Sequence, residues 1–93
     1  MYQLKYSKQF RKDFKRLQRG NFFPLQEFNS ALDSLINGVP LGARFLNHKL
    51  SGTWRDCYEC HLRPDMLFIY TIEKETNFIY LLRLGSHTEL FKL

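Results

Sequence analysis

The chain has 93 residues, of which 44% are hydrophobic and 16% aromatic, which suits one compact domain over residues 1–93 and leaves no material for a second. Its formal net charge of +5 favours a polyanionic partner such as RNA, although solubility alone accounts for a charge of this size. No apolar run of about eighteen residues and no secretory leader occurs, so we expect a cytoplasmic protein that does not contact a membrane.

The chain is expected to begin with a short strand and an amphipathic helix. Residues 2–6 alternate apolar and polar, which is typical of a half-buried strand. Ser7 then stops this strand and is a plausible helix N-cap. Phe10, Phe14 and Leu17 follow at helical spacing, so one stripe of a helix of about twelve residues, ending near residue 20, faces a core.

The other faces of this helix are basic. Only Asp13 opposes a set of six cations: Lys8, Arg11, Lys12, Lys15, Arg16 and Arg19. A solvated helix face and a phosphate-binding surface both explain such a ridge, and this segment alone does not decide between them.

A second helix is predicted after Pro24, which suits the first turn of a helix. Its apolar positions recur at helical spacing: Leu25, Phe28, Leu32, Leu35 and Ile36. Asn37 and Gly38 end it. The two helices are therefore expected to form a hairpin.

The second half of the chain is predicted to be an antiparallel meander. A surface connection over residues 39–47 leads to three strands, at residues 54–62, 66–73 and 78–84. The first two meet at a turn containing Pro64. Ser86 caps a single helical turn near the C-terminus. The expected fold class is α+β.

The last strand contains one charged residue. Strict alternation places Phe78, Tyr80, Leu82 and Leu84 on one face and Ile79, Leu81 and Arg83 on the other. Both faces are apolar apart from Arg83, which therefore needs an anion. Glu59 could be an internal partner, but the position of Arg83 near the strand end favours an RNA phosphate.

The three histidines lie at the ends of expected elements. His48, His61 and His87 have Asp65, Glu59 and Arg83 nearby, and the hairpin turn should place His61 opposite Asp65. Cleavage of RNA by attack of the ribose 2′-OH needs a base, an acid and cations around the developing phosphorane charge. Histidine can take either proton role. The set therefore offers the parts for cleaving RNA.

The competing chemistry is the C-x-x-C formed by Cys57 and Cys60. Redox use would place the pair at a helix N-terminus, but here it falls inside a strand, which turns the two thiols to opposite faces. Zinc would need two more ligands, for which only His48 and His61 are at hand. We expect two buried, inert thiols, no metal and no cofactor.

Three blocks of sequence resemble one family. They are HKLSGTW at residues 48–54, ECHLRPD at residues 59–65 and LRLGSHTELF at residues 82–91, and together they resemble the YafQ branch of the RelE-type toxins. The resemblance implies an α+β domain of one strand, two helices and an antiparallel sheet. It also implies an endoribonuclease (mRNA interferase) toxin of a type II toxin–antitoxin system, which cuts messenger RNA in the ribosomal A site without a metal and is inhibited by a cognate antitoxin.

The resemblance also implies site residues. The family's functional positions match His48, His61, Asp65, Arg83, His87 and a C-terminal aromatic, Phe91. We assign His87 as general acid, Asp65 or His48 as general base with His61 assisting, Arg83 to the transition-state charge and Phe91 to base stacking. The acid and base labels could be exchanged.

Further residues are expected to contact RNA. Ribosomal RNA should bind the basic helix through Lys8, Arg11, Lys12 and Lys15. The chain has Tyr58 where family members often have arginine, which affects one backbone contact. It has Met66 where some have tryptophan, which affects base stacking and codon preference.

Two alternatives stay open. A ParE-like toxin that acts on DNA gyrase shares this fold, and a non-catalytic RNA-binding or zinc-binding module would suit the charge and the cysteines. The histidine and arginine set favours the ribonuclease, since a gyrase inhibitor has no need of it.

Overall fold

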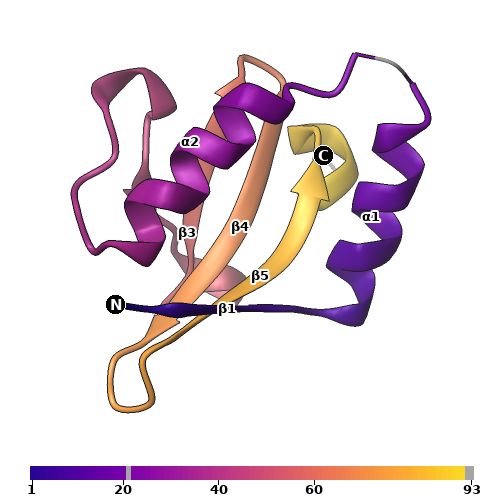
Figure 1. Ribbon diagram of the computed structural model, residues 1–93. Coiled ribbons are helices and arrows are strands. Elements are labelled where there is room, and N and C mark those ends of the chain that lie inside the picture. Colours follow the sequence, from indigo (N-terminus) through magenta and orange to yellow (C-terminus); the bar gives the residue numbers. More distant parts are fainter. Residues whose placement is uncertain (21, 92–93) are drawn as a thin grey trace.

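The computed structural model describes residues 1–20 and 22–91 and shows a mixed α+β fold (Figure 1). Five strands form one sheet in the order β1-β5-β4-β3-β2 over these residues. The strands are β1 (Gln3–Tyr6), β2 (His48–Lys49), β3 (Tyr58–Arg63), β4 (Met66–Glu73) and β5 (Phe78–Gly85). The helices are α1 (Lys8–Gln18), α2 (Leu25–Ile36) and α3 (His87–Phe91). None of these helices is long and apolar enough to cross a bilayer.

The expected fold class is confirmed, with one correction to the sheet. Strands β2 to β5 pair antiparallel in a meander, but β1 runs parallel to β5, with Gln3 opposite Phe78 and Tyr6 opposite Leu81. A parallel pair needs a long crossover, and α1, α2 and the rest of the sheet provide it.

The predicted start of α1 is confirmed. The Ser7 hydroxyl oxygen accepts a hydrogen bond from the Phe10 N–H at 2.9 Å, which satisfies one of the free amides of the first turn. The start of α2 differs slightly, because Pro24 precedes this helix rather than standing inside its first turn. Asn37 ends α2 as expected, and Gly38 has a φ of 67°, which glycine adopts without strain.

Helix α1 covers the part of the β5 edge that β1 leaves open (Figure 1). The Ser7 N–H donates to the Leu81 carbonyl at 2.9 Å, and the Ser7 hydroxyl donates to the Leu82 carbonyl at 2.8 Å. One turn later, Asp13 Oδ2 accepts from the Leu84 N–H at 3.0 Å. Serine and aspartate therefore replace a neighbouring strand along this edge.

Two apolar clusters lie on opposite faces of the sheet. The main core joins α1 and α2 to one face, where Phe28 meets Phe10 and the edge of Phe68 at centroid distances of 6.1 and 5.7 Å. The second cluster is centred on Leu67, Ile69 and Leu90, the last of which belongs to α3. The α3 side of the sheet is the one that carries the candidate site.

A bulge in β5 overturns the expected alternation. Ile69 pairs with Arg83 and Tyr70 pairs with Leu81, so Leu82 is an extra residue. Leu84 consequently joins Leu81 in the main core rather than sharing a face with Leu82. Arg83 turns to the face of its partner Ile69, away from Leu81.

The third expected strand is also shorter than predicted. It begins at Tyr58 and not at Trp54, because Gly52–Trp54 forms a 3₁₀ turn and Asp56 has a φ of 71°. The predicted turn at Pro64 is confirmed, since β3 ends at Arg63 and β4 begins at Met66.

Candidate active site

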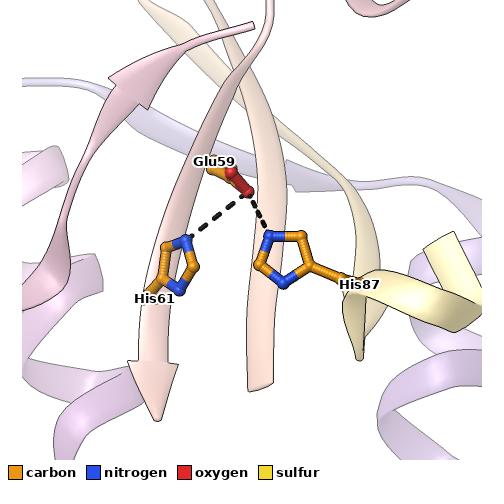
Figure 2. Close-up of side chains that lie close together, drawn as sticks. All are labelled: Glu59, His61 and His87. Carbon is orange, nitrogen blue, oxygen red and sulfur yellow. Dashed lines mark hydrogen bonds and ion pairs between the residues drawn. The ribbon is translucent and has the colours of Figure 1, made fainter. Parts of the chain in front are cut away.

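Glu59 on β3 is surrounded by all three histidines of the chain. Its side chain is buried, with 5% of its surface exposed. Oε1 lies 3.0 Å from His87 Nε2 and 3.5 Å from His61 Nε2, and Oε2 lies 3.0 Å from His48 Nε2. Figure 2 shows Glu59 with His61 and His87. We call these four residues the histidine cluster.

Strand pairing explains two of the three contacts. His48 on β2 is the direct cross-strand partner of Glu59 on β3. His61 is two residues beyond Glu59 on the same strand, so both side chains point to the same face. The sheet thus delivers two imidazoles to one carboxylate without any loop.

A capping box positions the third histidine. The Ser86 hydroxyl oxygen accepts from the Glu89 N–H at 3.1 Å, and Glu89 Oε1 accepts from the Ser86 N–H at 3.1 Å. The predicted Ser86 cap is therefore confirmed. It fixes the start of α3, where His87 is the first residue and its ring reaches Glu59.

The ring nitrogens of the three histidines have different surroundings. His48 Nδ1 lies 2.8 Å from the Leu46 carbonyl oxygen, so both of its nitrogens face oxygen acceptors. His61 Nδ1 is buried and has no hydrogen-bond partner within the described part of the chain. Among native proteins such an orphaned nitrogen is uncommon and marks a functional site more often than a structural one.

Asp65 lies in the turn between β3 and β4, where it contacts α3. Its Oδ1 accepts from the backbone N–H of His87 at 3.4 Å. The expected partner of Asp65 was the His61 side chain, but His61 points to Glu59 instead. Asp65 therefore holds the start of α3 close to the turn.

Arg83 is on the same face of the sheet as Glu59. Ile69 on β4 pairs with Glu59 on one side and with Arg83 on the other. Two strand spacings separate the two charged residues, which is about 10 Å between Cα atoms. The β5 bulge is what places Arg83 on this face, because unbroken alternation would put it on the opposite one.

The internal partner of Arg83 is Asp13 and not Glu59. Arg83 Nε donates to Asp13 Oδ2 at 2.9 Å, and Nη2 donates to Oδ1 at 3.4 Å. Burial alone would raise the pKa of Asp13, but the hydrogen bonds from Arg83, the Leu84 N–H and Gln9 outweigh it and hold this pKa below its ordinary value. Because 24% of the Arg83 side chain stays exposed, its guanidinium remains accessible to an anion.

The expected RNA-contacting residues are on two surfaces. The four cations Lys8, Arg11, Lys12 and Lys15 are all exposed on α1. Asp13 does not oppose them at the surface, because it is turned inward to Arg83. Phe91 lies one turn after His87, and their rings stack at 5.7 Å.

The two departures from the family pattern are packed into the protein. Met66 is half-buried against the main core. Tyr58 stacks on Tyr70 with ring centroids 5.4 Å apart.

The cysteines do not form a joint site. Cys60 is in the main core, whereas Cys57 packs against the second cluster on the other face. Burial raises the pKa of Cys60 to about 12, and burial together with the nearby Asp56 charge raises the pKa of Cys57. The expectation of inert thiols on opposite faces agrees with this, except that Cys57 is half-buried rather than buried.

Sequence reasoning missed the central role of Glu59. Glu59, His61 and His87 offer ligand atoms that all lie within 4.8 Å of one another, and imidazole with carboxylate is a donor set that suits transition metals. The i, i+2 spacing of Glu59 and His61 in a predicted strand was the available signal. Nothing local pointed to His87 as the third member.

Comparison with known proteins supports the same assignment. Residues 2–92 match the family model described as "Bacterial toxin of type II toxin-antitoxin system, YafQ". A putative toxin YafQ from Haemophilus influenzae is 31% identical, over 90% of this chain and 86% of the relative. The mRNA interferase toxin YafQ of Escherichia coli K12 is 30% identical, over 95% of this chain and 94% of the relative.

Solved structures share the whole fold. A metal-bound toxin from Helicobacter pylori superposes with a TM-score of 0.90 and 42% identity, covering 98% of this chain and 100% of that chain. YafQ in the Escherichia coli DinJ–YafQ complex gives a TM-score of 0.85 and 29% identity, covering 98% of this chain and 99% of that chain.

Proposed function

The chain belongs to the YafQ family of bacterial toxins of type II toxin–antitoxin systems, and we propose that it is an mRNA interferase that cuts messenger RNA on the ribosome. The observation that carries the proposal is the histidine cluster: three imidazoles around one buried carboxylate, on the sheet face that also presents Arg83. Proton transfer and charge stabilisation, the two requirements of RNA cleavage, are met side by side.

We assign the chemistry to attack by the ribose 2′-oxygen on the adjacent phosphorus. A base takes the 2′-OH proton, the P–O5′ bond breaks, and an acid protonates the leaving O5′. The products are a 2′,3′-cyclic phosphate and a 5′-hydroxyl. All electrons stay within the substrate and the two proton carriers, so the reaction as proposed needs no metal and no cofactor.

His87 is the proposed general acid. Its Nε2 faces Glu59, which leaves Nδ1 for the substrate. The His87 side chain is 36% exposed, against 11% for His61. Asp65 or His48 is the proposed base, and the more enclosed His61 assists. Arg83 stabilises the phosphorane charge, and Phe91 stacks on a base.

Binding to the ribosome is assigned to α1. Its exposed cations give a surface for ribosomal RNA phosphates. A chain with a radius of gyration of 12.5 Å has little further surface with which to hold free RNA in line for attack. Ribosomal RNA would therefore supply most of the positioning.

We further propose that a cognate antitoxin inhibits this single toxin domain in the cytoplasm, where messenger and ribosomes meet. The Escherichia coli relative has been solved with the protein DinJ. An acidic partner would complement the net charge of +5 and speed association at low salt. Co-purification with the product of the adjacent gene, and loss of ribonuclease activity in that complex, would support this part of the proposal.

Transcript ends mapped after brief expression test the function directly. Cuts within translated codons, which disappear when translation is blocked, are the expected result. In vitro, messenger alone should be cut slowly and ribosome-bound messenger rapidly, with chelator leaving the rate unchanged. Equal rates with and without ribosomes would contradict the proposal.

A further inference from the structure

A hollow of about 530 Å³ lies next to the histidine cluster, on the α3 side of the sheet. It is lined by Leu50, Ser51, Thr53, Trp54, Leu90 and Phe91. The hollow combines two aromatic rings with two hydroxyl side chains, and its lining contains no lysine or arginine. A flat, uncharged group with hydrogen-bonding edges fits this chemistry better than a phosphate does.

A series of aromatic contacts joins the hollow to the site of cleavage. The rings of His61 and His87 are 5.1 Å apart, those of His87 and Phe91 are 5.7 Å apart, and those of Phe91 and Trp54 are 6.4 Å apart. Trp54 is therefore the next ring after Phe91 along a continuous surface. A strand of RNA whose scissile phosphate lies at His87 would place a neighbouring nucleotide within reach of Trp54.

Trp54 is held in place before any ligand binds. One part of its half-exposed ring packs against the cluster of Leu67, Ile69 and Leu90. Its N–H donates to the Ser51 carbonyl at 3.3 Å, and its carbonyl accepts from the Cys57 N–H at 3.0 Å. A rigid ring loses little conformational entropy when a base stacks on it.

The Trp54 and Phe91 rings meet edge to face at 85°. We propose that the two rings and the Ser51 and Thr53 hydroxyls form a nucleobase subsite for a nucleotide next to the scissile phosphate, so that Trp54 contributes to codon preference. The base stacks on one ring, its edge meets the other, and the hydroxyls contact its polar atoms. This inference rests on the proposed function, because it takes the substrate to be messenger RNA.

The first test pairs a change in the protein with a change in the RNA. Single-turnover cleavage of ribosome-bound messenger is measured for the unchanged chain and for Trp54→Ala, each with normal RNA and with RNA made abasic at one position beside the cut. Loss of either partner of the stack should slow cleavage about tenfold or more. At one position the abasic change should add nothing to the effect of Trp54→Ala.

Two variants control this experiment. Trp54→Phe keeps an aromatic face and should retain most of the rate, whereas a purely structural tryptophan would show no link to the base. Phe22→Ala removes a ring that is 90% exposed and does not line the hollow, so its rate and its response to abasic RNA should match the unchanged chain. Additive effects of Trp54→Ala and the abasic change at every position beside the cut would overturn the subsite.

A second readout does not depend on cleavage. Trp54 is the only tryptophan of the chain, so its fluorescence reports on the hollow alone. A short oligoribonucleotide with 2′-deoxyribose at the cut position should quench it, and the abasic form of the same oligonucleotide should quench it less. His87→Gln should keep the quenching while losing cleavage. Failure of the unchanged chain to cut messenger would refute the function, and equal quenching by both oligonucleotides would refute the subsite.

Discussion

Nε2 of His87 lies 3.0 Å from Oε1 of Glu59, although the two residues are 28 positions apart in the sequence. The contact joins the first residue of α3 to the middle of β3, across the face of the sheet that carries Arg83. Glu59 also contacts His48 through its other oxygen. One buried carboxylate thus fixes the directions of the imidazoles that are assigned to the chemistry.

The first prediction concerns Glu59 as a positioning residue. Glu59→Gln keeps the shape of the side chain but replaces one acceptor oxygen with a donor, so one of its histidine contacts is lost. A displaced ring should lower the single-turnover rate about a hundredfold. The pH dependence of the rate should change as well, which a merely structural role would not cause. An unchanged rate and pH profile would contradict the assignment.

The second prediction separates the two roles of Arg83. Arg83→Ala should lower the cleavage rate by about 10² to 10³, the usual cost of one preorganised donor. It should also destabilise the fold by about 1–3 kcal/mol, because Asp13 loses its main charged partner while still buried. Asp13→Asn breaks the same ion pair but leaves the guanidinium on the sheet face, so it should cut at nearly the normal rate.

Rates and urea unfolding of both variants test this distinction, at a temperature where both are folded. Lys12→Ala on α1 should weaken ribosome binding and leave the chemical step unchanged. If Asp13→Asn lost as much activity as Arg83→Ala, stability rather than charge would explain the effect.

The third prediction uses the lowered pKa of Asp13. A carboxylate whose pKa is lower in the folded than in the unfolded chain contributes stability at neutral pH, and this contribution is lost as the pH falls through its folded value. The free energy of unfolding should therefore drop below about pH 3.8, the ordinary value of this group. The drop should be smaller in Asp13→Asn than in the unchanged chain. Glu75→Gln, in an exposed turn, should leave the acid profile as it is.

The fourth prediction concerns the thiols. Since burial raises the pKa of Cys60 to about 12, iodoacetamide should leave Cys60 unmodified in the folded protein at pH 8. Cys57 should react slowly, and both should react in urea. Mass spectrometry of the alkylated peptides gives the answer. Rapid modification of Cys60 without denaturant would show that the main core opens readily.

The sequence predicted the elements whose determinants are local. Ser7 and Ser86 were identified as helix caps because each stands just before a helical segment, and both caps are present. The alternation in the strand that became β4 and the turn at Pro64 were equally local. The three histidines were grouped correctly for a different reason, since their blocks resemble a family.

The errors all arose from contacts between distant residues. The β5 bulge depends on how Leu82 fits against β4, and no feature of β5 alone announces it. Asp13 looked like a surface charge on a basic helix, but the open edge of β5 and the Arg83 guanidinium turn it inward. Glu59 was considered as a partner for Arg83 because its true partners come from β2, β3 and α3.

The account depends most on His87 as the acid in an attack by the 2′-oxygen. His87→Gln should lower the single-turnover rate by about two to four powers of ten, with ribosome binding nearly unchanged. The most direct measurement is cleavage of ribosome-bound messenger that carries 2′-deoxyribose at the cut nucleotide, with all-ribose messenger as the matched control. The modified messenger should bind and stay intact over a time in which the control is fully cut. Cleavage of the modified messenger at a comparable rate would contradict 2′-oxygen attack and remove the reaction assigned to the histidine cluster.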